Sequence, residues 1–179
     1  MKFSTMLSDK GKDYFYIMHL SYNGNKREEL WNYAKDNNLI GLDAPGIVTE
    51  NWTEARKRES VRRQLGVTWI RQFDTFCFEM GVGDLVLVLC GWDSLLGVAE
   101  IVRRKHRYDR ELSASEKFFD HVKPVKWIKK YEYANRERLA EPLVSFNNTV
   151  SKVTPRSRRW SALTSLILSS VEMKELARF

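Results

Sequence analysis

The chain has 179 residues, of which 43% are hydrophobic and 30% are charged, and its formal net charge is +7 at pH 7. This length and apolar content suit one folded domain and exclude a wholly disordered chain. The sequence contains neither a secretory signal nor an apolar run of about 20 residues, so we expect a cytoplasmic protein that makes no membrane contact.

Positive charge is concentrated in two stretches, residues 51–75 and 103–130, whereas residues 76–102 contain no lysine or arginine. This pattern is typical either of solvated helices and loops or of a surface that faces a polyanion, most often nucleic acid. Cys77 and Cys90 lie in apolar segments, which predicts two reduced and buried thiols. Because the sequence has no Cys-x-x-Cys motif and its three histidines are scattered, we expect no metal and no cofactor.

The N-terminal part of the chain predicts a strand, a helix and a second strand after a polar start. Residues 1–13 are expected to be flexible. The predicted order is then a buried strand at 14–20, a turn at 21–25, an amphipathic helix at 26–37 and a short strand at 39–42.

Two helices are predicted next. The first is polar and covers residues 51–65, with Asn51 or Thr53 as its N-cap and Gly66 at its end. The second covers residues 68–80 and carries an apolar stripe that predicts a core-facing side. The stripe consists of Trp69, Phe73, Phe76 and Met80.

A β-hairpin is predicted over residues 85–102, where two apolar runs flank a turn. Residues 103–121 follow as a basic loop, whose length is typical of functional or disordered segments. A further strand is expected at 122–129, in which Pro124 favours an edge position or a bulge.

The C-terminal part gives fewer signals. Residues 139–144 fit either a helix or a strand, and Thr154 with Pro155 favours the start of a final helix. We expect a single domain over residues 14–170, followed by a tail at 171–179 where the chain is a candidate for truncation.

The sequence contains none of the common catalytic signatures. It lacks a phosphate-binding loop, a Gly-x-Gly-x-x-Gly fingerprint, a Gly-x-Ser-x-Gly elbow and a His-Glu-x-x-His motif. The residues therefore predict a basic, mixed α/β (α+β) domain that binds rather than catalyses.

The series of elements resembles the PUA-like superfamily, specifically its EVE and YTH branch. It is also similar to the N-terminal DNA-targeting domains of McrBC-type, modification-dependent restriction systems. The resemblance covers residues 14–165, and its most specific pieces are Gly83-Asp84, Leu-Gly-Val-Ala-Glu at 96–100 and Val-Lys-Trp-Ile at 125–128. It implies a curved, β-barrel-like sheet flanked by helices, with a pocket at one end.

The resemblance also implies a function. We expect a non-catalytic DNA-binding module that flips a modified base, N6-methyladenine or 5-methylcytosine, into an aromatic pocket. Its partners would be double-stranded DNA carrying that base and the AAA+ motor and nuclease subunits of a restriction complex. The alternatives are an RNA-binding EVE- or YTH-like reader and a PUA-like hydrolase, although no catalytic pair is evident for the latter.

Carried over by position, the resemblance implies a set of base-pocket residues. Leu42 stands where YTH domains have a cage tryptophan, so an aromatic cage is incomplete at this point. The full set is Asn23, Asn25, Leu42, Asp43, Trp52, Tyr108, Phe118, Phe119 and Asn147. Each group has a structural alternative. The two N-terminal asparagines could form a turn, either phenylalanine could anchor the loop, and Trp52 could staple its helix.

Two further groups of residues are expected to contact the duplex. Trp92 is at the tip of the predicted hairpin, where it could wedge into the base stack or pack onto a neighbouring loop. The phosphate-binding candidates are basic residues of the long loop and of the C-terminal part. They are Arg103, Arg104, Lys105, Arg107, Arg156, Arg158 and Arg159.

Overall fold

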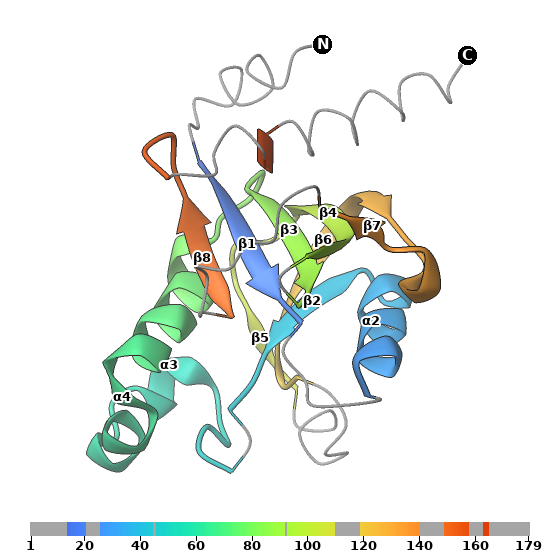
Figure 1. Ribbon diagram of the computed structural model, residues 1–179. Helices are drawn as coiled ribbons and strands as arrows, with labels where there is room; N and C mark the ends of the chain where they lie inside the picture. Colours follow the sequence, from blue (N-terminus) through green and yellow to red (C-terminus); the bar gives the residue numbers. More distant parts are fainter. Residues whose placement is uncertain are drawn as a thin grey trace.

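The computed structural model describes residues 14–20, 26–44, 46–91, 93–109, 119–139, 149–157 and 163–164. Within these ranges the strands form one curled sheet with the main order β2-β6-β4-β3-β1-β8, while β5 pairs with β6 and β7 with β4 (Figure 1). The strands are β1 (Phe15–His19), β2 (Leu39–Leu42), β3 (Leu85–Cys90), β4 (Ser94–Ile101), β5 (Arg107–Tyr108), β6 (His121–Lys130), β7 (Glu137–Arg138) and β8 (Val150–Val153). The fold is therefore mixed α+β, as expected.

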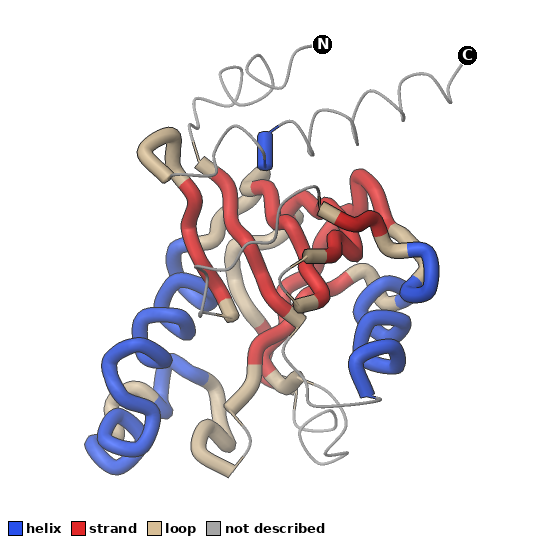
Figure 2. The backbone as a smooth tube through the Cα atoms, in the orientation of Figure 1, coloured by secondary structure: helices blue, strands red, loops and turns tan. Residues whose placement is uncertain are grey.

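Helices flank the sheet on two sides, α4 near β8 and α2 near β7 (Figure 2). The helical segments are α2 (Lys26–Asp36), α3 (Trp52–Ala55), α4 (Glu59–Asp74), the π-helix η1 (Thr75–Glu79) and the 3-10 helix η2 (Tyr133–Asn135). Across the described part of the chain, no helix is both long and apolar enough to cross a membrane.

Helix boundaries follow the local signals in the sequence. The Asn51 side chain caps α3 by accepting a hydrogen bond from the Thr53 backbone N–H at 3.0 Å. Gly66 interrupts α4 with φ 71° and ψ 167°, a conformation that glycine adopts without steric cost. The predicted helix end at Gly66 is thus a break within α4, and the helix resumes after it.

Both faces of the central sheet are buried, which explains the nearly continuous apolar runs of β1 and β3. On β1, Tyr16 and Met18 join the larger core on the side of the helices, whereas Phe15 and Ile17 join a second core on the opposite face. β1 and β3 pair in parallel at the middle of the sheet. The free thiols of the two cysteines are buried, as predicted.

The predicted core-facing stripe is confirmed, although one member is only partly buried. Phe73, Phe76 and Met80 are fully buried, whereas Trp69 is half-buried and packs against the same core. Its truncation is therefore not a test of the central core.

The predicted edge or bulge at Pro124 is wrong. Pro124 lies in β6, between β2 and β4, and pairs with Leu39 of β2. It is tolerated because β4 ends at Ile101 beside it, and the Val102 N–H then donates to the Pro124 carbonyl at 3.2 Å.

Three strands were not expected, namely β7, which pairs with β4, and the strands β5 and β8. The basic loop contains β5, whose residues Arg107 and Tyr108 pair with Val122 and His121 of β6. β8 pairs antiparallel with β1 at an edge of the sheet. All three strands are short and take their conformation from the neighbour with which they pair, so their own sequences carry little signal.

Candidate functional site

A pocket lies where the end of β1, one side of α2, β2 and β6 meet. Its lining is mainly apolar and includes the aromatic side chains of Trp31, Phe119 and Trp127. His19, at the end of β1, and Asp43, just after β2, add polar groups. A pocket with aromatic walls and few polar groups is the usual design for a planar ligand.

Two tryptophans form a rigid wall of this pocket. The Trp31 indole N–H donates to the Tyr131 carbonyl at 2.9 Å, and the Trp31 and Trp127 rings meet edge to face with centroids 5.1 Å apart. Both rings pack against Gly97, where a Cβ would lie 3.0 Å from each indole. Hydrogen bonding, ring contact and backbone packing together fix this wall.

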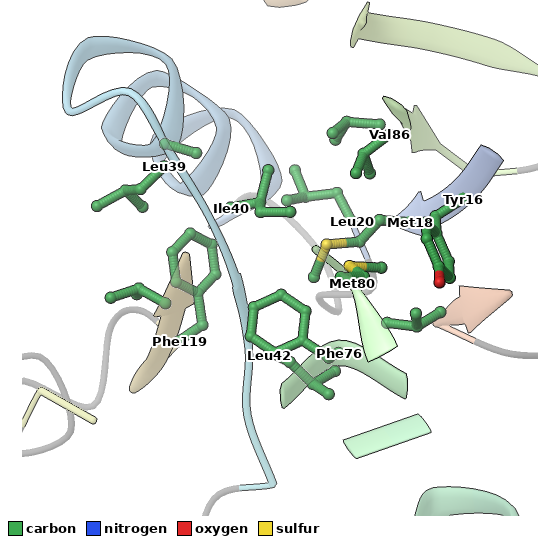
Figure 3. Close-up of a cluster of buried hydrophobic side chains, with 14 of the residues drawn as sticks. Tyr16, Met18, Leu20, Leu39, Ile40, Leu42, Phe76, Met80, Val86 and Phe119 are labelled. Carbon is green, nitrogen blue, oxygen red and sulfur yellow. The ribbon is translucent and has the colours of Figure 1, made fainter. Parts of the chain in front are cut away.

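Phe119 closes the pocket from the opposite side. Its ring lies so close to the Gly41 backbone that a Cβ at Gly41 would overlap the ring atoms Cγ, Cδ2 and Cε2. The Tyr33 ring is 6.4 Å away, centroid to centroid, and Figure 3 shows Phe119 on the side of β2 opposite Ile40 and Leu42. The remaining cavity is about 30 Å³ for water centres, enough for about two waters at ~10–15 Å³ each.

Asp43 is half-buried at the pocket and carries a perturbed carboxyl group. Its pKa is raised to about 6, mainly by burial and also by the neighbouring Asp120, while His121 acts in the opposite direction. The carboxyl group is therefore ionised at pH 7 and accepts hydrogen bonds, whereas at pH 5 most molecules carry its proton.

Two buried histidines lie close together, His121 at the start of β6 and His106 just before β5. His121 bonds Asp120 Oδ1 through Nδ1 at 2.8 Å, and the His106 ring stacks on it with centroids 5.8 Å apart. The pKa of His106 is lowered to about 4, mainly by burial and also by the neighbouring His121 and Lys123. His106 is therefore neutral at pH 7.

The basic segment, residues 103–107, follows β4 and leads into β5. Arg103, Arg104 and Lys105 are exposed, and among the described residues none of them forms an ion pair. Arg107 pairs with Asp109 at 2.9 Å.

A buried lysine holds the basic segment in place. The Lys123 Nζ donates to the Met80 carbonyl at 2.9 Å and also to the Arg104 carbonyl. Burial lowers the Lys123 pKa to about 8, which leaves the ammonium group largely charged at pH 7. This anchor fixes the backbone of the segment while its side chains stay in solvent.

The basic segment is close to the pocket through β6. Val122 pairs with Gly41 of β2 on one side and with Arg107 of β5 on the other. Neighbouring strands are about 4.8 Å apart, so these two residues are separated by about two strand spacings. The pocket and the cations can therefore contact one ligand.

Four of the six cations in residues 51–75 have acidic partners, unlike Arg103, Arg104 and Lys105. Ion pairs join Arg56 to Asp74 at 3.2 Å, Lys57 to Glu54 at 2.9 Å, Arg58 to Glu50 at 2.8 Å and Arg63 to Glu59 at 2.7 Å. Much of the positive charge predicted over residues 51–75 is thus neutralised locally, and the basic segment is the better candidate for a polyanion-binding surface.

The structure brings together three of the predicted base-pocket residues, Leu42, Asp43 and Phe119. Tyr108 is half-buried on β5 and packs on the His121 ring at 5.1 Å, and it does not belong to the lining described for the pocket.

The structure corrects the predicted position of Trp52, which does not lie at the pocket. Trp52 is fully buried, stacks on Phe73 with centroids 4.7 Å apart, and donates its N–H to Asp74 Oδ1 at 2.8 Å. These contacts use both the ring face and the polar edge of Trp52, so the side chain belongs to the core beneath α3.

The other predicted residues divide into two groups. Arg156 is exposed in the turn after β8, at the sheet edge opposite β2. The remaining candidates lie outside the described residues. These are Asn23, Asn25, Phe118, Asn147, Trp92, Arg158 and Arg159.

Sequence reasoning did not assign Trp31, Trp127 or His19 to a site. Trp127 is buried and also lines the pocket. The apolar stripe of α2 shows that Trp31 faces inward, and only the chain path shows that the space beside it is a pocket.

These features define a curled-sheet α+β domain with a small aromatic pocket beside a basic segment. Residues 17–153 match the family model described as "Domain of unknown function (DUF8426)", and the chain belongs to this family. No curated protein and no solved structure matches the chain.

Proposed function

We propose that this chain is a non-catalytic module with a PUA-like, EVE/YTH-type fold that recognises a modified base in double-stranded DNA. The base, N6-methyladenine or 5-methylcytosine, is flipped out of the duplex into the pocket. In this proposal the module directs a restriction complex whose AAA+ motor and nuclease are other subunits.

One observation carries the proposal, namely that an aromatic pocket and a row of exposed cations lie on opposite sides of the same strand, β6. Trp31, Phe119 and Trp127 supply ring surfaces, and Asp43 supplies a hydrogen-bond acceptor for a base edge. The basic segment lies two strands from β2. Base readers need this combination, because phosphate contacts position the ligand and the pocket specifies it.

The proposal is tested by titrating the protein with fluorescent duplexes of one sequence. The duplexes are unmodified or carry one 5-methylcytosine or one N6-methyladenine, and each is made as DNA and as RNA. We expect a preference for one modified DNA of about 5- to 150-fold, since a buried methyl group contributes about 1–3 kcal/mol. Equal affinity for all duplexes would show that the pocket does not read a modification, and a preference for the RNA series would favour an RNA reader.

Asp43 gives the preference a pH dependence. An ionised carboxylate accepts a strong, charge-assisted hydrogen bond from the exocyclic amino group of adenine or cytosine, and this bond is weakened when the group is protonated and keeps only a neutral acceptor. Because the Asp43 pKa is about 6, we expect the preference for the modified duplex to fall about tenfold between pH 7 and pH 5.

Asp43→Asn is the matched variant for this prediction. It keeps a carbonyl acceptor but cannot titrate, so its preference is expected to stay constant over the same pH range. The unmodified duplex, titrated in parallel, corrects for changes in phosphate binding. A wild-type preference that does not change with pH would exclude a hydrogen bond from the base to Asp43.

A further inference from the structure

A second cavity, of about 440 Å³, lies between β8 and the helical segments α4 and η1. We call it the edge groove, because β8 ends the sheet order in the described part of the chain. Figure 1 shows α4 alongside β8, and β2, which lines the aromatic pocket, is at the other end of that order. The volume of the edge groove is within the usual range of ligand sites, about 300–1,000 Å³.

The backbone of β8 directs hydrogen-bonding groups away from β1 and toward the edge groove. The His19 N–H donates to the Thr149 carbonyl, and along an antiparallel pair the hydrogen-bonded positions alternate with positions that face outward. Val150 and Lys152 of β8 are therefore outward-facing positions. The Val150 N–H agrees with this direction, because it donates to Gln72 Oε1 of α4 at 3.0 Å.

The helical wall of the edge groove is polar, although a helix side that covers a sheet is normally apolar. Gln72 and Thr75 are buried in this wall. Its members are Val67, Thr68, Arg71, Gln72, Thr75 and Glu79. A helix that only shields a strand edge would fill the space against it, whereas this wall leaves a cavity and faces it with polar groups. Such a wall suits a ligand that carries hydrogen-bonding groups along its length.

We infer that the edge groove binds an extended peptide segment of a partner protein, which adds a strand to β8. The inference does not rest on the proposed function. In strand addition the main-chain hydrogen bonds supply affinity and the neighbouring side chains supply specificity. Gln72 already serves the Val150 N–H as the carbonyl of a neighbouring strand would, and the backbone of Lys152 supplies the next outward-facing groups with which the peptide pairs.

The charge of the edge groove favours an acidic peptide. Arg71 is exposed and forms no ion pair with another described residue. The Lys152 ammonium group lies over the Tyr14 ring, 3.8 Å from its centroid. Glu79 is the acidic residue of the lining. Because two cations face one acid, a carboxylate on the peptide is attracted to the groove and can pair with Arg71.

The test begins with a phage-displayed library of random peptides, about twelve residues long, which is selected on the immobilised full chain. Selected peptides are synthesised and titrated by fluorescence anisotropy. We expect them to contain an acidic residue, and we expect Arg71→Glu to weaken their binding about fivefold, the upper effect of an exposed ion pair. A selection that yields no binding peptide, or peptides that Arg71→Glu binds as well as wild type, would overturn the inference.

Lys152 offers a matched pair of variants. Lys152→Pro removes the outward-facing N–H and leaves the hydrogen bonds to β1 in place, because proline is tolerated on an edge strand at such a position. We expect it to weaken peptide binding about tenfold, the effect of losing one hydrogen bond. Lys152→Ala removes the charge but keeps the N–H, so we expect a change of about twofold. Equal losses in the two variants would mean that the peptide contacts the side chain and not the strand edge.

Modified peptides test strand addition on the wild-type protein, and so cover the case in which Lys152→Pro fails to fold. One selected peptide is methylated on the backbone nitrogens of either its odd-numbered or its even-numbered residues. Only alternate N–H groups of an added strand face β8, so one set should abolish binding and the other should retain it. Equal loss with both sets would overturn strand addition.

Two further results would assign the edge groove to a different occupant and overturn the inference. Competition between a selected peptide and a single-stranded oligonucleotide of about twelve nucleotides would assign it to nucleic acid. Dimerisation of the protein in sedimentation experiments, if Lys152→Pro abolishes it and Lys152→Ala does not, would assign the edge of β8 to a second copy of the chain.

Discussion

Alanine at Arg103, Arg104 and Lys105 together is expected to weaken binding to duplex DNA by up to about 500-fold at about 0.1 M salt. These side chains are exposed and form no ion pair within the described part of the chain. Each one that contacts a phosphate releases about 0.9 counterion, so the slope of log K against log salt should decrease by about 2.7. Anisotropy titrations over a series of salt concentrations measure both quantities.

The matched control for this variant is alanine at Arg56, Arg58 and Arg63, which removes the same charge from α3 and α4. Each of these arginines already has an acidic partner, so its loss leaves that acid unpaired without removing a free cation. We expect the salt slope to change by less than about 1. Equal changes in the two variants would mean that net charge acts at a distance, with no local phosphate contact at the basic segment.

Both variants should leave base discrimination intact. The ratio of affinities for modified and unmodified duplexes depends on the pocket, and its lining contains none of the six substituted residues. A lost ratio in the Arg103, Arg104 and Lys105 variant would indicate that phosphate contacts are needed to hold the flipped base in place.

Much of the fold could be predicted from the sequence because its strong signals are local. The apolar runs of β1 and β3, the hairpin of β3 and β4, and the amphipathic α2 lie within a residue or two of the predicted ranges. β8 could not be found this way, because its four residues are ordered by pairing with β1. The prediction of an edge or bulge at Pro124 failed for a similar reason, since only the end of β4 at Ile101 explains why an inner strand tolerates this proline.

The candidate site was predictable only in part. The resemblance gave Leu42, Asp43 and Phe119. Leu42 ends β2, Asp43 follows it and Phe119 lies just before β6, so the three residues meet when the two strands pair. The resemblance could not give the position of the Phe119 ring, which lies against the Gly41 backbone because β2 pairs with β6, the strand that Phe119 precedes.

For Trp52 the sequence reasoning assigned a core residue to the binding site, because this tryptophan follows a glycine-containing turn. Trp52→Ala is expected to lower the free energy of unfolding by about 3–5 kcal/mol, the usual effect of truncating a large buried aromatic side chain. The change removes the ring stacked on Phe73 and the N–H that bonds Asp74. Urea denaturation followed by circular dichroism measures the loss.

Trp52→Phe distinguishes a core role from a role in base reading. Phenylalanine keeps a ring on Phe73 but lacks the N–H, and Asp74 retains Arg56 at 3.2 Å. We therefore expect a smaller loss of stability, about 1–2 kcal/mol, with unchanged preference for the modified duplex. Should Trp52→Phe stay as stable as wild type yet lose that preference, Trp52 would belong to the reading surface after all, and the pocket would have to extend beneath α3 in the bound state.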